Sequence, residues 1–143
     1  MRFEFVEGIT LADTAVRSYG KTLPELFESS ALGLLNLMAG DQIKTGRDKK
    51  FEIELENSDI EMLLYDFLNE FLFYRDARSL LIFPETIEIK EIENRFVLTV
   101  LMSAEKIDPA RHKMDTEVKA VTLHRFSVKG KPGAYESLVV YDL

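Results

Sequence analysis

The last residues of the chain place two anionic groups side by side. Asp142 is followed directly by Leu143, whose main-chain carboxylate ends the sequence of 143 residues. The apolar run over 138–141 predicts a strand, which would hold this end in place. Hard cations such as Ca²⁺ or Mg²⁺ prefer oxygen ligands, and two or three carboxylates could anchor one. The sequence therefore predicts a candidate cation site here, with an exposed terminal acid as the alternative.

Three other kinds of residue could take part in chemistry. Asp13 lies in an otherwise uncharged stretch over 8–16, so it is either a turn or cap residue or a carboxylate held as a cation ligand or general base. Lys119 is either a lysine on the wet face of a sheet or a group that meets phosphate or keeps an aspartate ionised. The histidines, His112 and His124, are similarly ambiguous, and the alternation around His124 favours a half-buried structural residue.

The composition excludes several classes of protein. A net charge of −7 and a pI of about 4.9 argue against strong direct binding to nucleic acid or to an anionic membrane. The absence of cysteine excludes disulfides, thiolate metal sites and cysteine nucleophiles. No apolar run approaches the roughly 18 residues of a membrane span, and the first ten residues lack the pattern of a signal peptide. These absences predict a soluble, cytoplasmic protein.

The charge is unevenly distributed. Residues 105–131 hold seven Lys or Arg against four Asp or Glu, a balance of +3 that leaves −10 for the rest of the chain. Familiar catalytic motifs are absent, including GxGxxG, the phosphate-binding loop, paired histidines at zinc spacing and the serine elbow. Candidate chemistry is therefore limited to carboxylates, a few basic residues and the chain terminus.

The apolar pattern predicts two amphipathic helices among strands. Thr22 and Glu25 form a capping box before a helix that Gly40 ends, and Ser58 and Glu61 form a second one before the other helix. Strands are predicted over 2–7, 12–19, 49–57, 86–92, 95–104, 117–128 and 134–141, the last four as two hairpins. This order predicts one α+β domain over residues 1–143, with a largely antiparallel or mixed sheet and two helices packed on it.

Several of these segments together resemble the archease family. TLADTAVRSYG is similar to the family's opening pattern, in which His-Thr-Ala-Asp precedes a Tyr-Gly pair. GKTLPELFESSALGLLNLM and SDIEMLLYDFLNEFLFYRD resemble its two helices, and IDPARHKMDTEVKAVTLH resembles its most distinctive segment. The chain departs from the family in having Thr10 and Leu11 in place of His-Thr, and Leu123 in place of a tyrosine.

The resemblance implies a site and a role. Asp13, Asp142 and the terminal carboxylate of Leu143 would form a metal site, with Ca²⁺ as the first expectation and Mg²⁺ or Mn²⁺ as alternatives. Lys119 would support activity. The family implies a protein cofactor, not an enzyme: an activator of an RtcB-type RNA ligase that promotes guanylylation of the ligase by GTP, supports multiple turnover and serves tRNA splicing and RNA repair.

Two other functions stay open. The protein could be a metal-stabilised chaperone or adaptor for RNA-processing proteins. It could also be a small metal-dependent phosphoesterase in which Asp13 and Asp142 hold the metal and Lys119 meets phosphate, although no nucleophile or general acid is evident for it.

Overall fold

Two helices and seven strands make up the part of the chain that the computed structural model describes, residues 2–6, 13–40, 49–108 and 116–143. In chain order they are β1 (Phe3–Val6), β2 (Asp13–Gly20), α1 (Leu23–Ala39), β3 (Lys49–Asn57), α2 (Ile60–Arg78), β4 (Leu80–Ile92), β5 (Arg95–Lys106), β6 (Ala120–Lys131) and β7 (Ala134–Asp142). Both helices lie where the sequence predicts them, whereas β4 starts six residues before the strand predicted from position 86.

The strands form two antiparallel sheets. The first sheet has the strand order β1-β2-β7-β6, and the second sheet has the order β3-β5-β4. Every neighbouring pair in both sheets is antiparallel. The predicted α+β class and antiparallel pairing are confirmed, while the division into two sheets has no counterpart in the sequence pattern.

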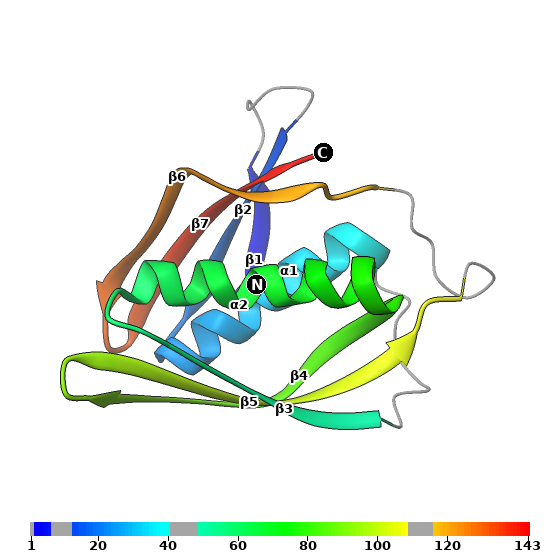
Figure 1. Cartoon of the computed structure of the whole chain (residues 1–143). Helices are drawn as coiled ribbons and strands as arrows, with labels where there is room; N and C mark the ends of the chain where they lie inside the picture. Colours follow the sequence, from blue (N-terminus) through cyan, green and yellow to red (C-terminus); the bar gives the residue numbers. More distant parts are fainter. Residues whose placement is uncertain (1, 7–12, 41–48, 109–115) are drawn as a thin grey trace.

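The helices lie between the two sheets, as Figure 1 shows. Helix α1 contacts β1, β2 and β7 of the first sheet and β4 of the second, and α2 contacts β6 of the first sheet and all three strands of the second. One apolar core therefore joins both sheets through the helix layer. Phe27 of α1 stacks on Phe67 of α2 with ring centroids 5.7 Å apart, and both rings are fully buried. Neither helix of the described residues is long and apolar enough to cross a membrane.

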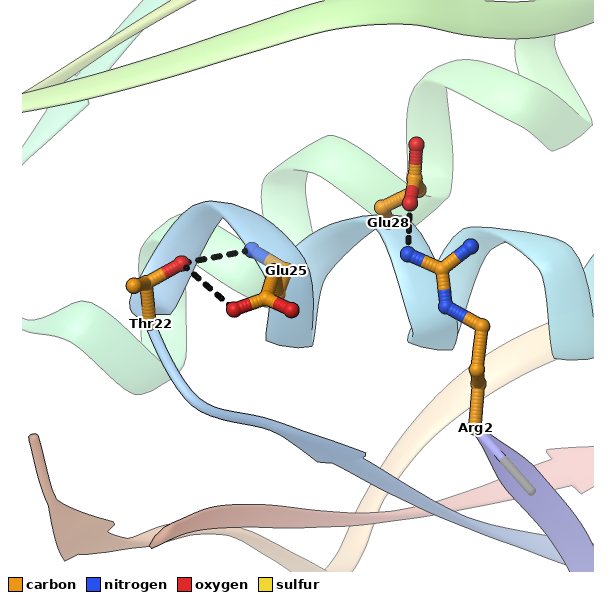
Figure 2. Close-up of polar contacts among 4 residues, drawn as sticks. All are labelled: Arg2, Thr22, Glu25 and Glu28. Atoms are coloured by element: carbon orange, nitrogen blue, oxygen red, sulfur yellow. Dashed lines mark hydrogen bonds and ion pairs between the residues drawn. The ribbon is translucent and has the colours of Figure 1, made fainter. Parts of the chain in front are cut away.

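The predicted N-cap of α1, Thr22, is confirmed, while the carboxylate of Glu25 accepts from the hydroxyl of Thr22 and not from its main-chain N–H as in a capping box. The main-chain N–H of Glu25 donates to Oγ1 of Thr22 at 3.2 Å, and that hydroxyl lies 3.4 Å from Oε2 of Glu25 (Figure 2). One turn further along, the carboxylate of Glu28 forms an ion pair with Arg2, just before β1 (Figure 2). The start of the helix is thereby fixed against the start of the chain.

The predicted cap of α2 is wrong by one residue. Asp59, not Ser58, is the N-cap, and its Oδ1 accepts the N–H of Glu61 at 2.9 Å. The carboxylate of Glu61 does not close a capping box, because it accepts the main-chain N–H of Val128 in β6 at 2.9 Å. The side chain of Glu61, which the local pattern assigns to the cap, thus contacts a residue 67 positions further along the chain.

Strand β6 separates from its partner strand part of the way along. Its pairing with β7 shifts register between Thr122 and Ser127, and Arg125 in between has a φ of 55°. Residues other than glycine rarely occupy that left-handed region. The interpretation of His124 as half-buried is wrong, because in this irregular stretch its side chain is exposed.

A close approach between β2 and α1 requires a glycine. A Cβ atom at Gly20 would lie 2.4 Å from the main-chain nitrogen of Leu26 and 2.8 Å from the main-chain carbonyl carbon of Glu25. Main-chain atoms inside a capped helix cannot rotate away as a side chain can. Gly20 therefore sets how closely the helix lies on the first sheet.

We expect Gly20→Ala to lower the free energy of unfolding by about 1–3 kcal/mol, the usual cost of overpacking. Urea denaturation measures it. Gly133→Ala is the matched control, because its Cβ would meet nothing within 4 Å and only the φ of 98° opposes it. A loss for Gly133→Ala reports the cost of alanine at a positive φ, whereas a loss below about 0.5 kcal/mol for Gly20→Ala would show that the contact with α1 does not restrict this position.

The outer face of α2 carries two acids one turn apart, Asp66 and Glu70. Burial raises the pKa of Glu70, and the neighbouring carboxylate of Asp66 raises it further. A raised pKa in the folded state gives stability at low pH that is lost as the pH rises through that pKa. The ionised Glu70 is therefore unfavourable to the fold at neutral pH.

We expect Glu70→Gln to raise the free energy of unfolding at about pH 7 by about 0.2–0.5 kcal/mol, the cost of a like-charge pair at this spacing. At about pH 3, where Glu70 is protonated in both states, the gain should vanish. Thermal unfolding across this pH range tests it, and an equal gain at both ends would contradict the electrostatic cause.

Candidate metal centre

The ends of three strands of the first sheet meet at one edge. Strand β2 begins at Asp13 and β7 ends at Asp142, and the antiparallel register places these two residues directly opposite each other. Strand β6 begins at Ala120, which is opposite Asp142 on its other side. Figure 1 shows the C-terminus beside the first residues of β2 and β6. The fold thus brings together two acids from opposite ends of the sequence.

The two aspartates share one face of the sheet. The next register pair, Thr14 and Tyr141, lies on the other face, where Tyr141 is completely buried. Successive side chains alternate between faces, so Asp13 and Asp142 both point away from the helix layer. Directly opposed residues of an antiparallel pair have Cβ atoms roughly 4.5–5.5 Å apart. Both aspartates are half-buried.

The end of the chain is held in place, as the apolar run over 138–141 predicts. Strand β7 continues to Asp142, whose main-chain oxygen accepts the N–H of Lys119 at 2.8 Å. Leu143 is half-buried and packs against the core. Leu143, the predicted source of the third carboxylate, therefore follows a fixed strand next to the two aspartates.

This arrangement suits a hard cation. Two side-chain carboxylates and one main-chain carboxylate would supply oxygen ligands, and water or a partner protein would complete the six to eight that Ca²⁺ takes. No group of three or more His, Cys, Asp or Glu side chains within the described ranges could hold a metal. The predicted site has only two such side chains and depends on the terminal carboxylate, so metal binding by Asp13, Asp142 and Leu143 stays a prediction.

The other predicted functional residues fall in different places. Lys119 is exposed and lies next to the strand-end acids through its main-chain hydrogen bond. Its role in activity stays a prediction. His124 lies in the irregular part of β6, away from the first residue pairs of that strand. Thr10, Leu11 and His112 lie outside the described residues.

Sequence reasoning missed Tyr141. Its side chain is completely buried behind the acidic strand ends, and its hydroxyl has no hydrogen-bond partner among the described residues. Burial raises its pKa far above the ordinary value of tyrosine. The side chain of Tyr141 is thus uncharged and held in the core, on the face of the sheet opposite to Asp13 and Asp142. The only sequence sign was its place in an apolar run, which predicts burial and nothing more.

A separate hollow of about 350 Å³ lies at the other end of β2 and β7. Its lining includes Tyr19, Lys21 and Tyr135, together with Arg2 and Glu25 of Figure 2. None of the predicted site residues belongs to this hollow. The strand-end acids and the hollow are therefore distinct features of the first sheet.

Comparison with known proteins gives a consistent result. A model of the archease protein family (MTH1598/TM1083) matches residues 3–143. The archease of Pyrococcus furiosus is 34% identical over 133 residues, which cover 92% of this chain and 93% of that protein. The archease of Thermococcus kodakarensis is 37% identical over 134 residues, with the same two coverages of 92% and 93%.

Solved structures agree. The solution structure of protein 1598 of Methanobacterium thermoautotrophicum has a TM-score of 0.83 and 32% identity, and the match covers 99% of both chains. A crystal structure of an archease from Thermotoga maritima, described as a possible chaperone, has a TM-score of 0.60 and 22% identity over 98% of both chains. At that identity the second likeness concerns the fold alone.

The fold and the strand-end acids together define a small acidic α+β protein of two sheets around a helix layer. By its family match and by its identity to the relatives above, this chain belongs to the archease family.

The geometry predicts opposite effects of Asp142→Asn on metal affinity and on stability. Loss of one ligand charge should weaken Ca²⁺ binding about tenfold or more in isothermal titration calorimetry. Without metal, the variant should be more stable by about 0.2–1 kcal/mol, because Asp142 directly opposes a like charge at Asp13. Two glycines added after Leu143 should also weaken binding while leaving the unfolding midpoint unchanged.

Glu136→Gln is the control for this experiment. Glu136 lies on β7 and on the same face as Asp142, at the far end of the strand. It should bind Ca²⁺ as the wild type does. Wild-type affinity in both Asp142→Asn and the extended chain would mean that the strand-end acids hold no metal.

Proposed function

We propose that this protein activates an RtcB-type 3′-phosphate RNA ligase in tRNA splicing and RNA repair. It would act as a protein cofactor in the cytoplasm, not as an enzyme by itself. Its acidic strand ends would promote guanylylation of the ligase by GTP and so support multiple turnover. The observation that carries the proposal is the direct pairing of Asp13 with Asp142 beside a fixed chain terminus, in a member of the archease family.

The strand ends could act in the nucleotide pocket of the ligase. A divalent cation bound there would offset charge on the phosphates of GTP. Asp13 and Asp142 would supply ligands from one face of the first sheet, and their fixed positions would avoid the entropy cost of ordering a loop. Lys119, exposed and next to these acids, could contact a phosphate or a carboxylate of the ligase.

The charge of the protein favours this partnership. An RNA ligase needs a basic surface to hold its substrate, and this protein has a net charge of −7. Complementary charge accelerates association and orients the encounter. The same charge disfavours direct, strong contact between this protein and RNA.

A second candidate function is that of a chaperone or adaptor for RNA-processing proteins. The observation in its favour is that the Thermotoga maritima relative is described as a possible chaperone. The two functions differ in their readout. An activator changes the rate of guanylylation, whereas a chaperone changes the yield or solubility of its client.

A phosphoesterase is less well supported. The residue opposite Asp142 on the β6 side is Ala120, which offers neither a nucleophile nor a general acid. Assay of the purified protein alone against phosphate esters separates this function from the other two.

The deciding experiment measures guanylylation of the ligase by GTP with and without this protein. Wild type should accelerate guanylylation, Asp142→Asn should lose most of that acceleration, and Glu136→Gln should keep it. Acceleration kept in Asp142→Asn would retain the partner and discard the strand-end site. No acceleration by wild type, with a ligase that is active alone, would overturn the proposal.

A further inference from the structure

The edges of the two sheets are not equally protected. A sheet edge presents unpaired main-chain groups, and proteins block it with short strands, proline, irregular pairing, a covering side chain or charged side chains on the edge strand. In the first sheet, the edge strand β1 has only four residues. The other edge strand, β6, has an irregular register, and the main-chain N–H of Val128 donates to the carboxylate of Glu61. In the second sheet, β4 contains Pro84 and a register shift next to it.

Among the described residues, strand β3 has only charged side chains to protect it, and these repel a partner of like charge while attracting one of opposite charge. Its nine residues pair with β5 in one uninterrupted register from Lys49 to Asn57. No described strand pairs with its other side. A full row of main-chain groups is therefore available for pairing along this edge.

The side chains of β3 give this edge its charge. Glu52, Glu54 and Glu56 alternate along one face and are all exposed. Phe51 and Leu55 point to the helix layer yet are only half-buried. Lys50 shares the face of the glutamates, and Arg95 forms an ion pair with Glu56, its Nε lying 3.7 Å from Oε1. The edge thus combines three carboxylates on one face with accessible apolar surface on the other.

A hollow of about 460 Å³ lies beside β3, against α2. Its apolar walls are Leu55 and Phe73, and 51% of the Phe73 side chain is exposed. Its polar lining includes the carboxylates of Asp66 and Glu70 and no basic residue. Any segment that fills this hollow would meet apolar surface and negative charge together.

We propose that the edge of β3 and the hollow between β3 and α2 bind an extended, basic segment of a partner protein by strand addition. Main-chain hydrogen bonds to β3 would fix the segment as a fourth strand of the second sheet. Alternate side chains would then point to the two faces. Lysine or arginine on one face would meet the glutamates, while apolar side chains on the other would contact Phe73. This surface is independent of the strand-end acids, which belong to the first sheet.

Charge favours a basic segment over a second copy of this chain as the occupant. In antiparallel pairing of two β3 strands centred on Ile53, Glu52 would oppose Glu54 of the copy at two places, and Lys50 would oppose Glu56 at two others, so the attractive and repulsive pairs are equal in number. Like charges directly opposite each other are destabilising in a sheet. A basic segment would instead place opposite charge against Glu52, Glu54 and Glu56 alike.

The test uses a nine-residue synthetic peptide of alternating Lys and Val, matched to the length of β3. We expect it to bind the full chain and to protect alternate main-chain amides of β3 from hydrogen exchange. A peptide with the same residues in one Lys block and one Val block should bind more weakly and protect none of them. Equal binding of both peptides, without protection of β3, would overturn strand addition.

The matched variants are Glu54→Lys and Glu88→Lys. Both glutamates pair with Thr99 of β5 on the same face, one on the β3 edge and the other on the β4 edge. Glu54→Lys should weaken the alternating peptide about tenfold, which corresponds to about 1.4 kcal/mol, while Glu88→Lys changes affinity less than about twofold. Phe73→Ala should weaken it too.

Two further results would overturn the proposal. An equal loss in Glu54→Lys and Glu88→Lys would mean that the peptide senses only net charge. A dimer of the free protein in analytical ultracentrifugation that the alternating peptide dissociates would mean that a second copy occupies the edge.

Discussion

The pairing of β2 with β7 is the constraint on which the rest of the structure depends. Eight consecutive register pairs, from Asp13–Asp142 to Gly20–Tyr135, join the first long strand to the last one in the middle of the first sheet. A slip of one residue would turn every side chain of one strand to the other face. It would expose Tyr141 and bury the charge of Asp142. The apolar pattern that builds the core therefore also fixes the two acids opposite each other.

Helix α1 lies close to these two strands because the residues between them are small, and this closeness leaves two buried hydroxyls without partners among the described residues. Gly20 and Gly33 leave no room for a Cβ against α1 and Val16 respectively. Between those contacts, Ser18 and Ser137 form a register pair in which both hydroxyls are buried without a partner among the described residues. A buried hydroxyl without a partner costs about 1–3 kcal/mol. The close packing of α1 on the sheet is thus kept although the hydroxyls of Ser18 and Ser137 lack hydrogen bonds within the described residues.

Local signals predicted the elements well, and long-range contacts account for the errors. The cap at Thr22 formed as predicted because its partner, Glu25, is three residues away. The second cap lies at Asp59, and the carboxylate of Glu61, which the pattern assigned to the capping box, accepts an N–H from a distant strand. The irregularity that exposes His124 depends equally on β7. Asp13 and Asp142 were each candidates from the sequence, but only the resemblance placed them together, because no local pattern reports which strands pair.

Long-range contacts also make β6 a poor partner for the β3 edge of another copy, although the two edges carry opposite charge. The β3 edge is acidic, and β6 carries exposed Arg125, Lys129 and Lys131, so the two edges are complementary in charge. Charge alone does not form a sheet, since strand addition needs a regular row of main-chain groups on both sides. Strand β6 lacks that row because its register shifts and because Glu61 occupies an N–H on it. Helix α2 thus blocks one edge with the carboxylate at its start and, through Asp66 and Glu70, adds negative charge beside the edge that stays open.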